Sequence, residues 1–262
     1  MIGVLLRSRR GATIAWAVGI FLFGLLIGIA FQTISTAGDG AAYDELVDGL
    51  PDAVKEAFGG VGSLSTVEGF IRVEVTSYLP LVFSVLAISM ASKSLAAAQE
   101  TGLLDHLLAR PVTRTRYYSA AFIAHALELM ILHVAGMLGV GLGLLLSGVE
   151  VRTAYAAAFI LLEMYPLVFC FLGVGMLAGA LASRNGLAMG VGISLLVASF
   201  LVALVGRIWA DGDLLQWVTP FGYMDRSDWF HGELDLWYVA FCTLVGGAAG
   251  SGGLLRFTAK DL

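Results

Sequence analysis

The chain has 262 residues, of which 58% are hydrophobic and only 13% are charged. A soluble domain carries about 25% charged residues, so this chain has too few charges to cover a water-facing surface. The composition indicates an integral membrane protein. At about 20 residues per membrane-spanning helix, it leaves no length for a fused ATPase, kinase or nucleic-acid-binding domain. The net charge of −5 also argues against a nucleic-acid partner.

Six apolar runs with few or no charges are long enough to cross a bilayer as helices. They cover residues 12–34, 76–98, 119–146, 153–183, 186–206 and 236–255. The first run is too long for the apolar part of a cleaved signal peptide, so we expect it to remain as a helix. The sequence therefore predicts an all-α, polytopic membrane protein with six transmembrane helices in a single transmembrane domain, residues 1–262.

The basic residues predict the orientation of this domain. Ten of the 15 Lys and Arg residues fall on the side of the N-terminus, and five fall on the other side. Cytoplasmic loops carry an excess of Lys and Arg, so both termini are expected in the cytoplasm and the protein in the plasma membrane. Fifteen of the 20 acidic residues lie on the outer side, many of them in the outer loop 35–75.

Two short stretches outside the spans have the pattern of interfacial helices. Residues 50–59 begin with Leu50-Pro51 and end with glycine, as a short helix would, and their apolar residues share one face. Residues 1–10 make a weaker case for a second such helix at the inner surface. The alternatives are a solvated loop and a fraying terminus.

Pairs of glycines four residues apart occur within the spans. Such pairs let helix backbones approach closely, so they predict sites of helix packing. The pairs are Gly24 with Gly28, Gly139 with Gly143, and Gly175 with Gly179.

The cytoplasmic loop 99–118 has the most specific pattern in the chain. Its leucines recur at helical spacing among charged residues, and the run is broken at Pro111 before a basic turn. This pattern predicts a short amphipathic helix. Such a helix could anchor to anionic lipid headgroups or dock into the groove of a cytoplasmic partner.

The loop resembles the first cytoplasmic loop of permease subunits from the type-2 ABC exporter family. There an acidic residue, a Gly-Thr-Leu-Glu-like helix and a Pro-Val-Ser/Thr-Arg turn recur. The matching residues here are Glu100, Gly102, Leu103, Leu104, Asp105, Leu107, Leu108, Pro111 and Arg114. Thr219-Pro220-Phe221 and the C-terminal residues 256–262 also match, whereas Leu103 and His106 depart from the family pattern.

This resemblance implies a permease subunit of an ATP-driven exporter. Two copies, or one copy and a related permease, would form the path within the lipid, and two copies of a separate ABC ATPase would bind ATP and Mg²⁺. The nine loop residues would couple the ATPase to the spans. The chain has no Gly-x-x-x-x-Gly-Lys-Ser/Thr loop, so we expect it to bind no cofactor, to hold no catalytic residue and not to be an enzyme itself.

His125, Glu128 and His133 lie within the third span, and Glu163 lies within the fourth. A charge inside a bilayer is costly, so one hypothesis is a substrate or proton path, and a proton-coupled carrier using Glu128 and Glu163 is the alternative function. The other hypothesis is that these side chains pair with one another between helices, and a purely structural membrane subunit is a third possibility. The two histidines are about 12 Å apart along the helix, so no metal site or membrane enzyme is expected. The apolar spans favour a hydrophobic or amphipathic cargo.

Overall fold

The computed structural model describes residues 1–36, 44, 45, 49, 63–104, 112–209, 212–224, 230 and 235–259. Six stretches of helix within these residues are long and apolar enough to cross a membrane. The predicted all-α, polytopic fold is therefore confirmed.

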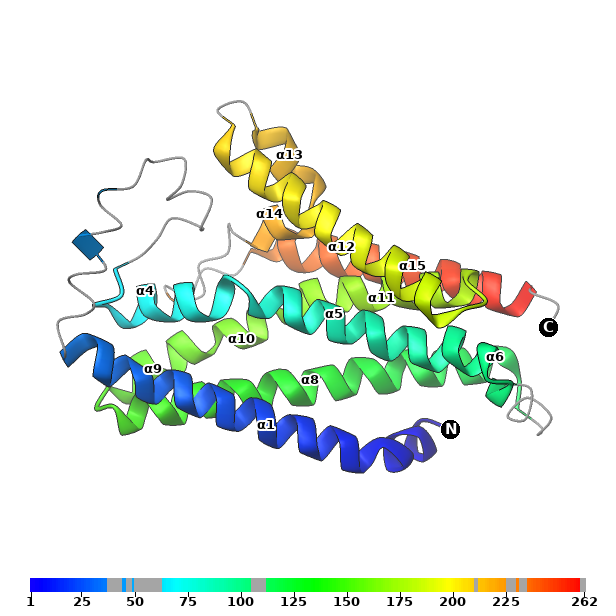
Figure 1. Ribbon diagram of the computed structural model, residues 1–262, viewed down its shortest axis with the longest axis horizontal. Helices are drawn as coiled ribbons and strands as arrows, with labels where there is room; N and C mark the ends of the chain where they lie inside the picture. The colour runs from blue at the N-terminus through cyan, green and yellow to red at the C-terminus, as the bar shows by residue number, and fades with distance from the viewer. Residues whose placement is uncertain are drawn as a thin grey trace.

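The stretches lie roughly along the long axis of the molecule, and the fifth (Asn185–Ile208) crosses it at an oblique angle (Figure 1). Four are single helices: α1 (Ile2–Thr36), α8 (Arg114–Leu146), α12 (Asn185–Ile208) and α15 (Leu236–Ala259). The second comprises α4 (Val67–Ile71), the π-helix η1 (Arg72–Thr76), α5 (Leu79–Ser92), the π-helix η2 (Lys93–Ala97) and α6 (Ala98–Glu100). The fourth comprises α9 (Val151–Ala158), α10 (Ile160–Glu163) and α11 (Tyr165–Leu181).

Three boundaries differ from the sequence-based expectation. Residues 1–10 do not form a separate interfacial helix, because α1 is continuous from Ile2. The second stretch begins at Val67, inside the expected outer loop, because the i,i+4 ion pair of Glu68 and Arg72 and the buried Ile71 extend it. The expected basic turn is the first turn of α8, where the Thr113 side chain accepts a hydrogen bond from the Arg116 N–H. The helix predicted at residues 50–59 lies outside the described residues.

Glycine faces bring the backbones of neighbouring helices together, as their spacing predicts. A Cβ atom built on Gly28 of α1 would lie 2.6 Å from the carbonyl oxygen of Val140 on α8. A Cβ on Gly143 of α8 would lie 2.4 Å from the carbonyl oxygen of Leu25 on α1. A Cβ on Gly175 of α11 would lie 2.9 Å from the Cα of Ile88 on α5, and a Cβ on Gly179 would lie 3.1 Å from the Cβ of Leu95 in η2. The contacts of Gly28, Gly143 and Gly175 leave no room for a side chain, and that of Gly179 is tight.

Among the described residues between α12 and α15, the chain forms two short helices. They are α13 (Asp213–Val218) and α14 (Pro220–Met224). The Thr219 side chain accepts a hydrogen bond from the Gly222 N–H at the start of α14, and Pro220 is the first residue of that helix. The ring of Phe221 is buried, 5.9 Å from that of Phe171 on α11. The Thr219-Pro220-Phe221 motif therefore makes a capped turn that anchors α14.

The two ends of the bundle carry different parts of the chain. The start of α1, α6, the start of α8 and the end of α15 lie at one end, and α4 and α9 lie at the other (Figure 1). The start of α1, the end of α15 and the described motif residues Glu100 and Arg114 therefore share one end of the molecule.

Candidate functional site

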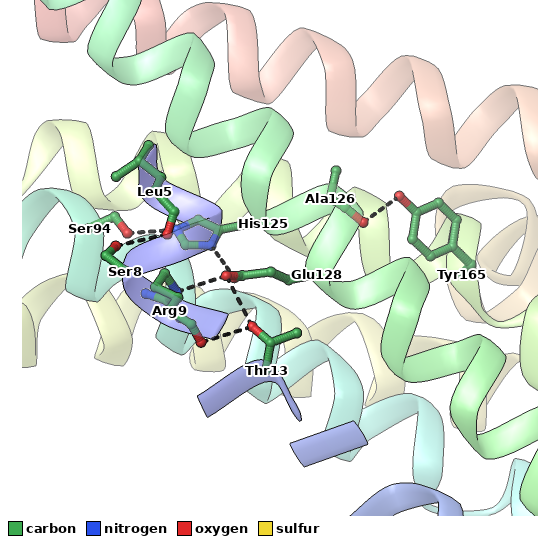
Figure 2. A network of polar contacts seen from close by, with 9 residues as sticks. All are labelled: Leu5, Ser8, Arg9, Thr13, Ser94, His125, Ala126, Glu128 and Tyr165. Carbon is green, nitrogen blue, oxygen red and sulfur yellow. Dashed lines mark hydrogen bonds and ion pairs between the residues drawn. The ribbon is translucent and has the colours of Figure 1, made fainter. Parts of the chain in front are cut away.

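Glu128, on α8, is almost completely buried, and each of its two carboxylate oxygens contacts polar side chains (Figure 2). Its Oε1 lies 3.0 Å from Nε of Arg9 and accepts a longer bond, 3.4 Å, from the Thr13 hydroxyl, both on α1. Its Oε2 lies 3.0 Å from Nδ1 of His125, one turn earlier on α8. The carboxylate therefore joins α1 to α8 through an ion pair and hydrogen bonds.

The network continues from His125 to the second stretch of helix. Nε2 of His125 lies 2.6 Å from Oγ of Ser94, in the π-helix η2 (Figure 2). Because a carboxylate only accepts, Nδ1 donates to Glu128, so Nε2 of the neutral ring accepts from the Ser94 hydroxyl. The Tyr117 hydroxyl on α8 donates to the Ser94 carbonyl oxygen at 2.7 Å. Three stretches of helix thus meet at one buried polar network.

His125 contacts Glu128 from the same helix, so this contact is not the expected pairing between helices. The partner of Glu128 on another helix is Arg9, which was not predicted. Arg9 belonged to the expected interfacial segment. Arg9 and Thr13 are four residues apart and so share one face of α1. This spacing could have suggested that Arg9 and Thr13 contact the same partner. It becomes informative only once α1 is known to be continuous from residue 2.

His133 and Glu163 occupy different environments. Nδ1 of His133 is 2.7 Å from the Leu129 carbonyl oxygen, and its ring packs against Phe83 and Tyr165. Glu163 is buried at the end of α10, where the fourth stretch is interrupted before Pro166. Its backbone carbonyl oxygen accepts a hydrogen bond from the Tyr238 hydroxyl of α15 at 2.8 Å. Glu163 therefore lies at a break in a helix.

Glu100, the first residue of the family motif, contacts the start of another long helix. Its Oε2 accepts a hydrogen bond of 2.9 Å from the Asn185 N–H, the first residue of α12. Ser92 donates to Oδ1 of the same asparagine at 2.6 Å. A carboxylate is favourable there because the first N–H groups of a helix lack partners and the end is partly positive. Glu100 thus ties the end of α6 to α12.

The other motif residues fall into three groups. Gly102 has φ +70, a left-handed conformation suited to glycine, and ends the turn after α6. Leu104 is buried and Leu103 exposed, while Arg114 begins α8. Four residues lie outside the described part of the chain: Asp105, Leu107, Leu108 and Pro111. The predicted amphipathic helix therefore stays a prediction.

A cavity of about 530 Å³ lies among α1, α5, α8, α10 and α12. Aromatic rings from Trp16 and Phe23 on α1 and from Phe83 on α5 line it, and Met189 contributes from α12. None of the lining residues is Asp, Glu, Lys, Arg or His. Met189 is one turn beyond Asn185, whose Nδ2 lies 3.8 Å from the Met189 sulfur. The contact of Glu100 with α12 is thus one turn from the cavity wall.

Metal-ligating side chains do not cluster in the described part of the chain. No group of three or more His, Cys, Asp or Glu residues there has the arrangement of a metal site. Cys170 and Cys242 are both buried as free thiols.

Residues 1–258 match the family model described as "Multidrug efflux system permease Rv1217c, C-terminal domain". The chain belongs to this family. The multidrug efflux system permease protein Rv1217c of Mycobacterium tuberculosis (strain ATCC 25618 / H37Rv) is 27% identical over 231 residues, which are 86% of this chain and 38% of that protein. The chain therefore spans less than half the length of this relative. The family match includes the polar network, the Glu100 contact and the cavity.

Proposed function

We propose that this protein is the membrane-embedded permease of an efflux system and that a separate ABC ATPase drives it. The family match and the name of the mycobacterial relative support a permease of this kind. The resemblance of loop 99–118 to the coupling loop of type-2 ABC exporters supports an ATPase partner, in two copies. Two permease units would form the path, with both termini in the cytoplasm and the protein in the plasma membrane.

The contact of Glu100 with Asn185 is the observation that carries the coupling mechanism. A partner can shift the permease between two states only through contacts that differ between them. An ATPase that displaces the loop after α6 would change the Glu100 contact and so move the start of α12. Because Met189 lies one turn further along α12, that movement reaches the cavity wall.

The Arg9–Glu128 pair supports an interhelical role for the buried carboxylate over a role as a proton carrier. A carrier must release the carboxylate from its partners in each cycle. Here Arg9, Thr13 and His125 together bind both oxygens.

Replacement of Glu100 by alanine tests the coupling mechanism. We expect Glu100→Ala to retain the ATPase during purification in mild detergent but to lower ATP-driven transport about two- to thirty-fold, the range for loss of one coupling contact. Glu150→Ala is a matched control, because Glu150 is an exposed acid before α9 at the other end of the bundle. This control is expected to transport normally.

Two results would overturn the proposal or part of it. If no ATP-hydrolysing subunit ever co-purifies with the wild-type chain from native membranes, the ABC assignment fails. If Glu100→Ala transports as well as Glu150→Ala, the coupling role of Glu100 is wrong, whether or not an ATPase is bound.

A further inference from the structure

The wall of the cavity is suited to an uncharged aromatic molecule. Four of its side chains carry aromatic rings: Trp16, Phe23, Tyr78 and Phe83. The volume, about 530 Å³, falls within the usual range for small-molecule sites, about 300–1,000 Å³. A charged molecule would lose its hydration there without meeting an opposite charge. Aromatic rings, in contrast, gain from offset or edge-to-face contacts with the wall.

His133 packs against Phe83, one of the residues that line the cavity. Its ring centroid is 4.2 Å from that of Phe83, which lines the cavity, and its side chain is completely buried. Nδ1 bonds to the Leu129 carbonyl oxygen, which can only accept, so Nδ1 carries the proton. Nε2 of the neutral ring is then an acceptor. It has no hydrogen-bond partner, which is unfavourable for a buried polar atom.

We propose that the cavity binds an uncharged, mainly aromatic molecule that carries an N–H or O–H group, and that this group donates to Nε2 of His133 when the Phe83 side chain rotates. A lipid acyl chain would fill the volume but offers no donor to His133. The inference rests on the proposed function, because it names the class of cargo, but binding requires no ATPase.

Two photoreactive probes of similar shape test the proposal. They are para-hydroxymethylbenzophenone, which has an O–H donor, and para-methylbenzophenone, which has none. Both are irradiated with the purified protein in phosphatidylcholine nanodiscs, and the labelled residues are found by peptide mass spectrometry. We expect both probes to label the cavity wall, including Met189. The hydroxymethyl probe should reach half-maximal labelling at a concentration about three- to ten-fold lower than the methyl probe, which corresponds to the free energy of one hydrogen bond.

Three variants separate filling of the cavity from hydrogen bonding. Gly19 lines the cavity, and a Cβ atom built there meets no atom within 4 Å, so Gly19→Leu fills the cavity without a backbone clash. It should abolish labelling by both probes. Gly247→Leu is the matched control, since Gly247 on α15 has equally open surroundings outside the cavity wall. His133→Leu should leave para-methylbenzophenone labelling unchanged and remove the preference for the hydroxymethyl probe.

The proposal is overturned if labelling maps elsewhere, if Gly19→Leu labels like Gly247→Leu, or if the preference persists in His133→Leu. It is also overturned if a phosphatidylcholine with a benzophenone at the end of one acyl chain labels the cavity and neither aromatic probe displaces it. If Gly19→Leu does not fold, the His133→Leu comparison decides. The labelling assay contains no ATP, so its result does not depend on whether an ATPase associates with the permease. If ATP-driven transport is intact but neither probe labels the cavity, only this inference is overturned, and the proposed function stands.

Discussion

Arg9 and Glu128 show how a carboxylate is accommodated in a largely apolar helix bundle. The Glu128 side chain is 1% exposed and the Arg9 side chain 33%, so the carboxylate depends on its partners more than the guanidinium does. The positions of His125 and Glu128 and their possible pairing could be predicted from the sequence, because an acid within an apolar run needs a partner. Arg9 could not be predicted as the partner of Glu128, because it lies 119 residues away in the sequence. The charges of its segment instead favoured a position at the membrane surface.

Substitution of Arg9 should destabilise the protein more than substitution of its neighbour. We expect Arg9→Leu to lower the free energy of unfolding by about 2–3 kcal/mol, because it leaves a buried carboxylate without its main partner. Thermal unfolding in detergent measures the effect. Arg10→Leu, at the adjacent exposed arginine, should leave the midpoint unchanged.

The double variant Arg9→Leu/Glu128→Leu removes both charges at once. It should recover much of the lost stability, because no buried charge then remains without a partner. If Arg9→Leu unfolds at the wild-type temperature, the ion pair contributes nothing to stability and our account of Glu128 is wrong.

At the scale of helices, the long apolar elements could be predicted and their interruptions could not. Length and hydropathy are sufficient for six spans, and glycine spacing marks helix faces that pack closely, but the pairing of α1 with α8 comes from the structure. The start of the second stretch was missed because Glu68 and Arg72 interrupt the apolar run, although they pair on one face of a helix. No pattern in the sequence marked the π-helices. The break before Pro166 is accompanied by the hydrogen bond from the Tyr238 hydroxyl to the Glu163 carbonyl oxygen, a contact 75 residues away that a single sequence does not reveal.

The contact of α1 with α8 should be sensitive to one added methyl group. In Gly28→Ala the new Cβ would lie 2.6 Å from backbone atoms of Val140 and Leu144, so the two helices must move apart. We expect a loss of about 1–3 kcal/mol in the free energy of unfolding. Gly11→Ala on the same helix places its Cβ in open space and should be neutral or stabilising, because alanine favours helix. Equal unfolding midpoints for the two variants would contradict the close packing.

At the scale of the whole molecule, the arrangement connects the family motif to the cavity. The start of α1, α6 and the end of α15 share one end of the bundle (Figure 1), and Glu100 links that end to α12 and its cavity-lining residue Met189. The sequence predicted the importance of Glu100 through a resemblance, but its partner Asn185 lies 85 residues away. The cavity could not be predicted, because its walls come from five helices and the sequence does not show which faces meet.

The most direct test of the account is transport by the permease and its co-purified ATPase in inside-out proteoliposomes, measured with an uncharged aromatic fluorophore. We predict uptake that requires ATP and the ATPase subunit, persists after the proton gradient is dissipated, and falls in Glu100→Ala. Uptake by the permease alone that disappears with the proton gradient and in Glu128→Gln would contradict the account and favour a proton-coupled carrier.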